Sequence, residues 1–101
     1  MKEINESEFE KVTKTGSVVV DFFGAGCINC KMTEPALLAL ETENPNVKFV
    51  KIDTGNAKKL TERFDIMALP TILFMKDGIV KETLVGLKPR GVLARTIAEN
   101  L

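Results

Sequence analysis

The two cysteines of the chain, Cys27 and Cys30, are separated by only two residues. They follow a strongly apolar run, residues 18–23, and precede a segment with a helical pattern. Two intervening residues let one sulfur reach the other and close a disulfide. A helix start also stabilises a thiolate, through its free N–H groups and the helix dipole. The spacing therefore indicates thiol–disulfide exchange, in which a thiolate attacks a disulfide.

The sequence contains no histidine, which excludes Ser/His and Cys/His nucleophile pairs and histidine metal ligands. Two thiolates alone cannot complete a tetrahedral zinc site, so a metal would need a second chain or a foreign ligand. We therefore expect no metal and no bound cofactor. Buried structural thiols remain an alternative, although a close cysteine pair in a reducing compartment is more often catalytic or metal-binding.

Composition and charge are those of an ordinary globular protein. The chain has 101 residues, 45% of them hydrophobic, which predicts a single domain over residues 1–101. Its 14 Lys and Arg balance 14 Asp and Glu, so we expect no nucleic-acid or membrane partner. We also expect a monomer. The first six residues are polar, and no apolar run approaches the roughly 20 residues that span a bilayer. A cytoplasmic location is the resulting expectation.

The amino-terminal pattern predicts a short edge strand around Ile4, followed by a short helix. Ser7 and Glu10 have the spacing of a capping box, which would open that helix. Phe9 and Val12 would then lie on its inner face.

Residues 18–23 are apolar on both alternate faces except at Asp21, which is typical of a central strand covered on both sides. A helical pattern then runs from Cys27 to about Glu43, with Pro35 inside it. An alternative starts the helix at Glu34, with Pro35 in the first turn and both cysteines on a loop. The predicted inward residues are Leu37 and Leu40, and the predicted exposed ones are Glu34, Glu41 and Glu43.

The remaining pattern alternates strands and helices. It predicts a turn at 44–46, a strand at 47–53, a helix carrying Ala57, Leu60 and Phe64 inward, a strand at 71–75, a hairpin turn at Asp77 and Gly78, a strand at 79–85, and a helix opened by Pro89 with Leu93, Ile97 and Leu101 inward. The order βαβαβαββα implies an α/β fold with a mixed sheet and helices on both faces. In such sheets, sites form beyond the carboxyl ends of the strands, where Cys27 falls.

Together these motifs resemble the thioredoxin family over essentially the whole chain. The residues that carry the resemblance, in the order and spacing of the family, are Val20, Asp21, Phe22, Phe23, Cys27, Cys30, Lys31, Met32, Pro35, Pro70, Thr71, Asp77, Gly78 and Gly86. The resemblance implies the thioredoxin fold, a mixed five-stranded sheet flanked by four helices, and reduction of protein disulfides. It implies thioredoxin reductase and disulfide-containing proteins as partners, and a redox-active disulfide in place of a cofactor.

The resemblance also assigns roles. Cys27 corresponds to the exposed nucleophile, Cys30 to the buried resolving cysteine, and Asp21 to the carboxylate beneath them. Burial should raise the pKa of Asp21, so that it can take the proton of Cys30; a satisfied polar group of the core is the alternative. Pro70 corresponds to a cis-proline, against the alternative of a trans turn proline. A cis bond there would turn the Leu69 backbone outward to pair with an extended substrate.

Seven residues are expected to form the surface that binds substrate. They are Gly26, Ile28, Asn29, Ala68, Leu69, Pro70 and Gly86. The alternative is that the apolar ones among them, together with Leu87, are ordinary surface residues.

The chain departs from the family pattern at the motif itself. Family members most often read Trp-Cys-Gly-Pro-Cys, whereas Gly26 precedes the motif here and Ile28 and Asn29 lie inside it. Loss of the tryptophan and the proline should change the reduction potential. The family often has a lysine near the buried aspartate, and the residue at that position here is Phe49. Without this cation Asp21 should be even harder to ionise, unless Lys51, on the same strand face, reaches in to replace it. A disulfide isomerase or oxidant, and a binding module whose thiols are not essential, are the alternative functions.

Overall fold

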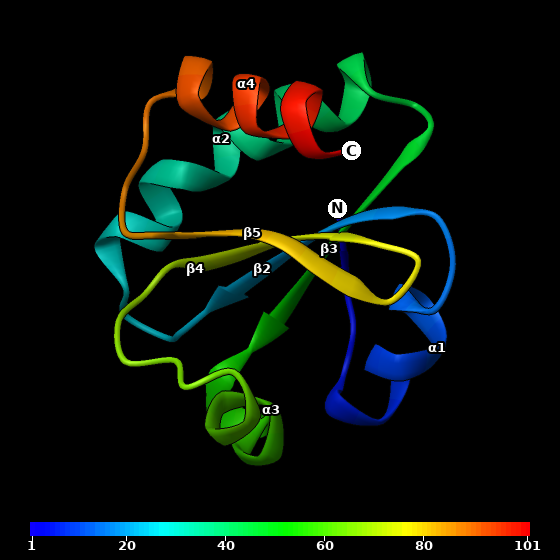
Figure 1. Cartoon of the computed structure of the whole chain (residues 1–101). Helices are drawn as coiled ribbons and strands as arrows, with labels where there is room; N and C mark the ends of the chain where they lie inside the picture. Colours follow the sequence, from blue (N-terminus) through cyan, green and yellow to red (C-terminus); the bar gives the residue numbers. More distant parts are fainter.

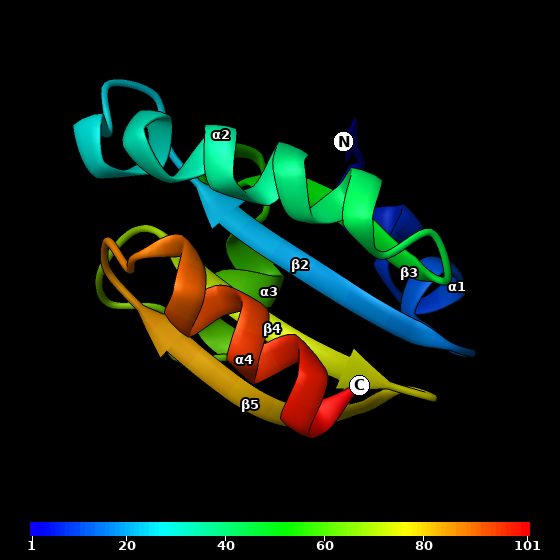
Figure 2. The ribbon, with the colours of Figure 1, turned by 90° about the horizontal axis from the view of Figure 1, so that it is seen from above.

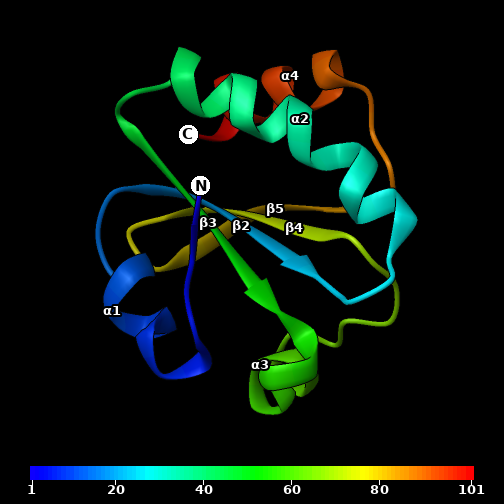
Figure 3. The same cartoon turned by 180° about the vertical axis from the view of Figure 1, so that it is seen from behind.

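The computed structural model describes residues 1–101 and confirms the predicted order of elements. These are β1 (Lys2–Glu3), the 3₁₀ turn η1 (Glu6–Glu8), α1 (Phe9–Thr13), β2 (Ser17–Phe23), α2 (Ile28–Glu43), β3 (Val47–Asp53), the 3₁₀ turn η2 (Thr54–Asn56), α3 (Lys58–Arg63), β4 (Thr71–Lys76), β5 (Ile79–Val85) and α4 (Arg90–Asn100). Figures 1 and 3 show α2 and α4 covering one face of the sheet and α1 and α3 the other.

The five strands form one mixed sheet in the order β1-β3-β2-β4-β5. β3 pairs in parallel with both β1 and β2, whereas β4 pairs antiparallel with β2 and β5. β2 is therefore the central strand, as its two apolar faces predict. The motif that contains both cysteines follows this strand directly.

A separate apolar core lies on each face of the sheet. The α1/α3 side consists of Ile4, Phe9, Val18, Val20, Phe22, Val50, Ile52, Ala57, Leu60, Leu73 and Met75. The α2/α4 side consists of Val19, Leu37, Leu40, Phe49, Ile72, Phe74, Leu93 and Ile97. Because side chains alternate along β2, Asp21 points to the same side as Val19, beneath α2.

Helix α2 begins at Ile28, with Cys27 as its N-cap residue and Pro35 in its interior. The alternative start at Glu34 is wrong. Leu37 and Leu40 are buried as predicted, and they belong to the same helix face as Cys30 and Thr33. Packing of this long face against the sheet outweighs the one hydrogen bond that a helix proline removes.

Two expectations for the amino-terminal region need correction. The capping box consists of Asn5 and Glu8, not Ser7 and Glu10: the Asn5 side chain accepts from the Glu8 N–H, and the Glu8 carboxylate accepts from the Asn5 N–H. The edge strand is Lys2–Glu3. Ile4 follows it and still donates its N–H to the Lys51 carbonyl at 2.9 Å.

The glutamates of α2 differ from the expectation as well. Glu43 is exposed, but Glu34 and Glu41 are half-buried because each binds a cation on the sheet side of the helix. Glu41 pairs with the amino group of Met1 at 3.0 Å, and Glu34 pairs with Lys51 at 2.9 Å.

The carboxyl-terminal half follows the prediction closely. Asp77 and Gly78 adopt positive φ angles of 49° and 82° in the hairpin turn between β4 and β5. Pro89 is the N-cap residue of α4, whose Leu93 and Ile97 are buried. No helix in the chain is both long enough and apolar enough to cross a membrane.

Candidate active site

Three connections meet at one end of the sheet: β2–α2, α3–β4 and β5–α4 (Figures 1 and 2). Two contacts join them. A Cβ placed on Gly24 would lie 2.8 Å from the Leu69 side chain, so the first two connections touch. The Gly86 N–H donates to the Pro70 carbonyl at 2.8 Å, which ties the third connection to the second. The predicted site residues in these loops are therefore neighbours in space.

Cys27 and Cys30 are joined by a disulfide, with their Cα atoms 5.3 Å apart. Cys30 is only 5% exposed, as expected for the buried partner. Cys27 was expected to be exposed and is half-buried, the more accessible of the two cysteines. The Cys30 N–H points at the Cys27 sulfur, 3.2 Å away. After reduction, this amide and the start of α2 would favour a thiolate at Cys27.

Asp21 is the one charged residue among the fully buried side chains, with 1% of its surface exposed. Its Oδ1 atom has no hydrogen-bond partner, so the alternative of a satisfied polar group of the core is wrong for this atom. Burial raises the pKa of Asp21 from 3.8 to about 7; the negative charge of Glu34 adds to the effect, and the positive charge of Lys51 opposes it. The predicted raised pKa is thus confirmed.

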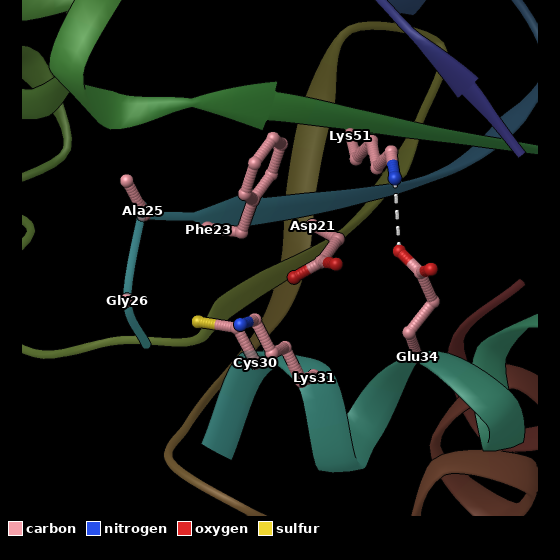
Figure 4. A pocket seen from close by; sticks show the side chains of 9 residues that line it. Asp21, Phe23, Ala25, Gly26, Cys30, Lys31, Glu34 and Lys51 are labelled. Carbon is pink, nitrogen blue, oxygen red and sulfur yellow. Dashed lines mark hydrogen bonds and ion pairs between the residues drawn. The ribbon is translucent and has the colours of Figure 1, made fainter. Parts of the chain in front are cut away.

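A pocket of about 290 Å³ lies between the sheet and the start of α2 (Figure 4). Its lining residues are Asp21, Phe23, Gly24, Ala25, Gly26, Cys30, Lys31, Glu34 and Lys51. The buried carboxyl of Asp21 and the sulfur-bearing residue Cys30 therefore line the same cavity.

Lys51 does not form an ion pair with Asp21. Its Nζ atom lies 2.9 Å from a Glu34 oxygen and 5.3 Å from the centre of the Phe23 ring. The hydrogen bond to Glu34 raises the pKa of Lys51 above 10.5. Phe49, at the position where the family often has lysine, is 3% exposed and packs in the apolar core.

Sequence reasoning missed Glu34 as a residue of the site. Its position was a usable signal, because Glu34 follows Cys30 by four residues and so shares its helix face. The partner strand could not be inferred in the same way, since the contact with Lys51 depends on how α2 lies across β3.

The Leu69–Pro70 peptide bond is cis, as expected. Leu69 is half-buried and packs against the core with its side chain, so it is not a free apolar surface residue. Its backbone N–H and carbonyl take part in none of the hydrogen bonds of the structure. The carbonyl of Ala68 is occupied, accepting from the Thr71 hydroxyl at 2.6 Å.

The motif residues on the outer side are open to solvent. Ile28 is 71% exposed, and Asn29 and Gly26 are exposed too. Sequence reasoning did not single out Met67, which is 87% exposed directly before Ala68. Exposed apolar side chains beside a disulfide are suited to contact with another protein. The structure contains no group of three or more His, Cys, Asp or Glu side chains that could hold a metal ion.

Comparison with known proteins gives one consistent result. The family profile described as thioredoxin matches residues 1–99. Thioredoxin of Listeria monocytogenes is 36% identical over 98 residues, which are 96% of this chain and 95% of that protein. Thioredoxin of Bacillus subtilis is 36% identical over 97 residues, 95% of this chain and 93% of that one.

Solved structures agree. Fasciola hepatica thioredoxin superimposes with a TM-score of 0.91 at 30% identity, over 100% of both chains. Mitochondrial thioredoxin 3 of Saccharomyces cerevisiae, in its oxidised form, gives a TM-score of 0.89 at 29% identity, over 98% of this chain and 94% of that one.

Proposed function

This chain belongs to the thioredoxin family of thiol–disulfide oxidoreductases, and we propose that Cys27 and Cys30 reduce disulfides of protein substrates in the roles described below. The observation that carries the proposal is the pairing of a half-buried Cys27 at a helix start with a buried Cys30 that shares a pocket with Asp21. Residues 1–101 act as a single thioredoxin domain in this proposal.

In the first step, the Cys27 thiolate attacks one sulfur of the substrate disulfide. A bond forms between Cys27 and that sulfur, the substrate S–S bond breaks, and the other substrate sulfur leaves as a thiolate that takes a proton from water. The Cys30 amide, 3.2 Å from the Cys27 sulfur in the oxidised state, supports the thiolate form. No histidine is needed as a base.

In the second step, Cys30 resolves the mixed disulfide. Its thiol gives a proton to the Asp21 carboxylate, and its sulfur attacks the Cys27 sulfur. The Cys27–Cys30 bond forms, and the second substrate thiolate leaves and is protonated. Two electrons and two protons pass to the substrate. A pKa of about 7 suits Asp21 to accept a proton and return it to solvent near neutral pH.

Substrate docks, in this proposal, on the loops around the disulfide. The free N–H and carbonyl of Leu69 pair with an extended segment of substrate, in the manner of an added strand. The surface is completed by the exposed Gly26, Ile28, Asn29 and Ala68 and the half-buried Gly86. Pro70 is buried, so its role in this proposal is to set the direction of the Leu69 backbone through the cis bond. Recognition through backbone groups demands little of the substrate's side chains.

A reductase must return two electrons to the Cys27–Cys30 disulfide after each turnover. We assign this role to thioredoxin reductase, in the cytoplasm, with the chain acting as a monomer. Family membership and the bacterial relatives support the assignment.

The decisive experiment follows turnover of a protein disulfide with dithiothreitol or thioredoxin reductase as donor. Cys27→Ser should abolish turnover, and Cys30→Ser should accumulate the mixed disulfide, visible by mass spectrometry. Asp21→Asn should slow resolution more than formation, whereas equal slowing of both steps would contradict the proton-accepting role. Turnover that survives Cys27→Ser would overturn the proposal.

The reduction potential separates a reductant from an isomerase. Thioredoxins themselves have potentials of about −270 mV, and protein disulfide isomerase about −180 mV. Equilibration of the Cys27–Cys30 pair with glutathione or dithiothreitol measures this value directly. A potential close to the first value supports the reductant assignment, and one close to the second replaces it with isomerase activity.

A further inference from the structure

Lys51 lies directly beside Asp21 in the pairing of β2 with β3, yet its ammonium group is bound elsewhere. It donates to Glu34 at 2.9 Å, from the strand across to helix α2. Figure 4 shows the Asp21 carboxyl beside this pair, with a dashed line between Lys51 and Glu34 and none to Asp21. A buried carboxylate with an unpartnered oxygen is thus left without the cation next to it.

We propose that Glu34 is a positioning residue that acts through Asp21: by holding the Lys51 ammonium, it keeps that cation from pairing with Asp21 and leaves Asp21 able to carry a proton at neutral pH. The inference rests on the proposed role of Asp21 as proton acceptor for Cys30.

The charged groups around Asp21 are few. On α2 the pocket is lined by Cys30, Lys31 and Glu34, and on β3 by Lys51. The register partner on β4 is Ile72, which is apolar and buried. Glu3 on β1 lies beside Lys51 in the sheet, and its negative charge raises the pKa of that lysine. Lys51 and Glu34 are thus the ionic groups whose charges act on Asp21.

The side chain of Lys51 is flexible enough for its ammonium group to bind either Glu34 or Asp21. Its side chain is 25% exposed, and a lysine stem is flexible, with an ammonium that bonds in any direction. Glu34 offers a partly hydrated carboxylate, 39% exposed, whereas an ion pair with Asp21 would require desolvation of the ammonium. Glu34 is therefore the favoured partner, and its removal leaves Lys51 with Glu3 and Asp21 as the carboxylates that act on it.

The two charges do not cancel at Asp21. Glu34 raises the pKa of Asp21 more than Lys51 lowers it. The effects of Glu34 and Lys51 on the pKa of Asp21 therefore have opposite signs and unequal sizes. Variants that remove one or both charges should for this reason rank in a fixed order of Asp21 pKa. An ion pair that only held α2 against β3 would lose similar stability whichever partner was removed. The pKa of Asp21 should instead move in opposite directions in the two variants.

The test is a ¹³C NMR titration of the aspartate carboxyls in the oxidised protein, with the Asp21 signal assigned by its loss in Asp21→Asn. In Glu34→Gln, the pKa of Asp21 should fall from about 7 by about one unit, because the nearby anion is gone and Lys51 is released. In Lys51→Gln it should rise. The double variant should lie between the wild type and Glu34→Gln.

Glu41→Gln is the matched control. Glu41 lies on the same helix, is half-buried, and pairs with the amino group of Met1 at 3.0 Å, but it does not line the pocket. It should leave the pKa of Asp21 unchanged. Swapping the pair, Glu34→Lys with Lys51→Glu, should lower the pKa of Asp21 while keeping an ion pair, because the cation then occupies the position of stronger influence.

A pKa of Asp21 that stays fixed or rises in Glu34→Gln would overturn the inference. The titration needs no enzymatic turnover, so it is independent of the proposed reaction. The pH profile of mixed-disulfide resolution should move with the titration. A moving pKa with a fixed profile would support the role of Glu34 and contradict only the proton-accepting role of Asp21.

Discussion

The Leu69 side chain occupies the space beside Gly24, with its Cδ1 atom 2.8 Å from where a Cβ on that glycine would lie. Gly24→Ala should push this side chain aside and displace the docking backbone with it. We expect a loss of about 1 kcal/mol in the free energy of unfolding and a higher KM for a protein disulfide. Urea unfolding and steady-state turnover measure the two effects.

Gly91→Ala provides the control for that substitution. Gly91 lies in α4, and a Cβ there meets nothing within 4 Å. Gly91 is in the first turn of α4, and alanine is a better helix former than glycine, so this variant should be at least as stable as the wild type and keep its KM. A rise in KM for both variants would show that the contact with Leu69 is not responsible.

Ile28 should contribute to substrate affinity through its exposed apolar side chain. It is 71% exposed beside the disulfide, so Ile28→Ser should hardly change stability. We expect KM to rise by about fivefold, which corresponds to about 1 kcal/mol of lost apolar contact. Ile79→Ser is the control, since Ile79 is 62% exposed at the hairpin. An equal effect of both substitutions would contradict a docking role for Ile28.

Asp21 should make the stability of the oxidised protein depend on pH. Its pKa is 3.8 when unfolded and about 7 when folded, so the folded state binds more protons between these values. The free energy of unfolding should therefore fall as the pH rises from about 4 to 7 and then level off. At most, the loss is roughly 4 kcal/mol.

Asp21→Asn tests this dependence because it keeps the shape and removes the charge. The variant should be more stable than the wild type at pH 8, and the gain should vanish near pH 4. Urea unfolding at several pH values gives the comparison. Parallel curves for the two proteins would mean that Asp21 does not titrate in this range.

Asn29 should accept the proline that the family motif usually has. Its N–H, in the first turn of α2, takes part in no hydrogen bond, so Asn29→Pro removes none. We expect a free energy of unfolding that is unchanged or up to about 1 kcal/mol higher. Lys31→Pro is the contrast, because the Lys31 N–H donates to the Cys27 carbonyl at 3.2 Å. It should cost about 3 kcal/mol.

Much of the fold follows from local patterns. Residues 18–23 are apolar on both faces, and the strand they predict is the centre of the sheet. The hairpin at Asp77 and Gly78 was equally readable, because few residues adopt positive φ at low cost. The capping box was misplaced because Asn5 with Glu8 and Ser7 with Glu10 offer the same chemistry. Packing contacts, which local spacing does not contain, decide between them.

Some residues of the candidate site can also be predicted from local sequence, and others cannot. The cysteine pair and Asp21 stand out locally, as a spacing and as a charge in an apolar strand. Glu34 and Lys51, which pair in the structure, are 17 positions apart in the chain and belong to different elements, α2 and β3. In the sequence, Lys51 is already a candidate partner of Asp21, whereas Glu34 has the appearance of an ordinary surface charge. The crossing of α2 over β3 brings Glu34 to the pocket and to Lys51.

Gly26 has a consequence for protein engineering. Its φ angle is +74°, and a Cβ on it would meet nothing within 4 Å, so space is available but the backbone shape disfavours any L-amino acid by about 1–2 kcal/mol. An aromatic residue before Cys27 is therefore disfavoured by main-chain conformation and not by crowding. Grafting the common Trp-Cys-Gly-Pro-Cys motif onto this scaffold exchanges three side chains, at Gly26, Ile28 and Asn29. It calls for a rebuilt loop, because the tryptophan would inherit a backbone made for glycine.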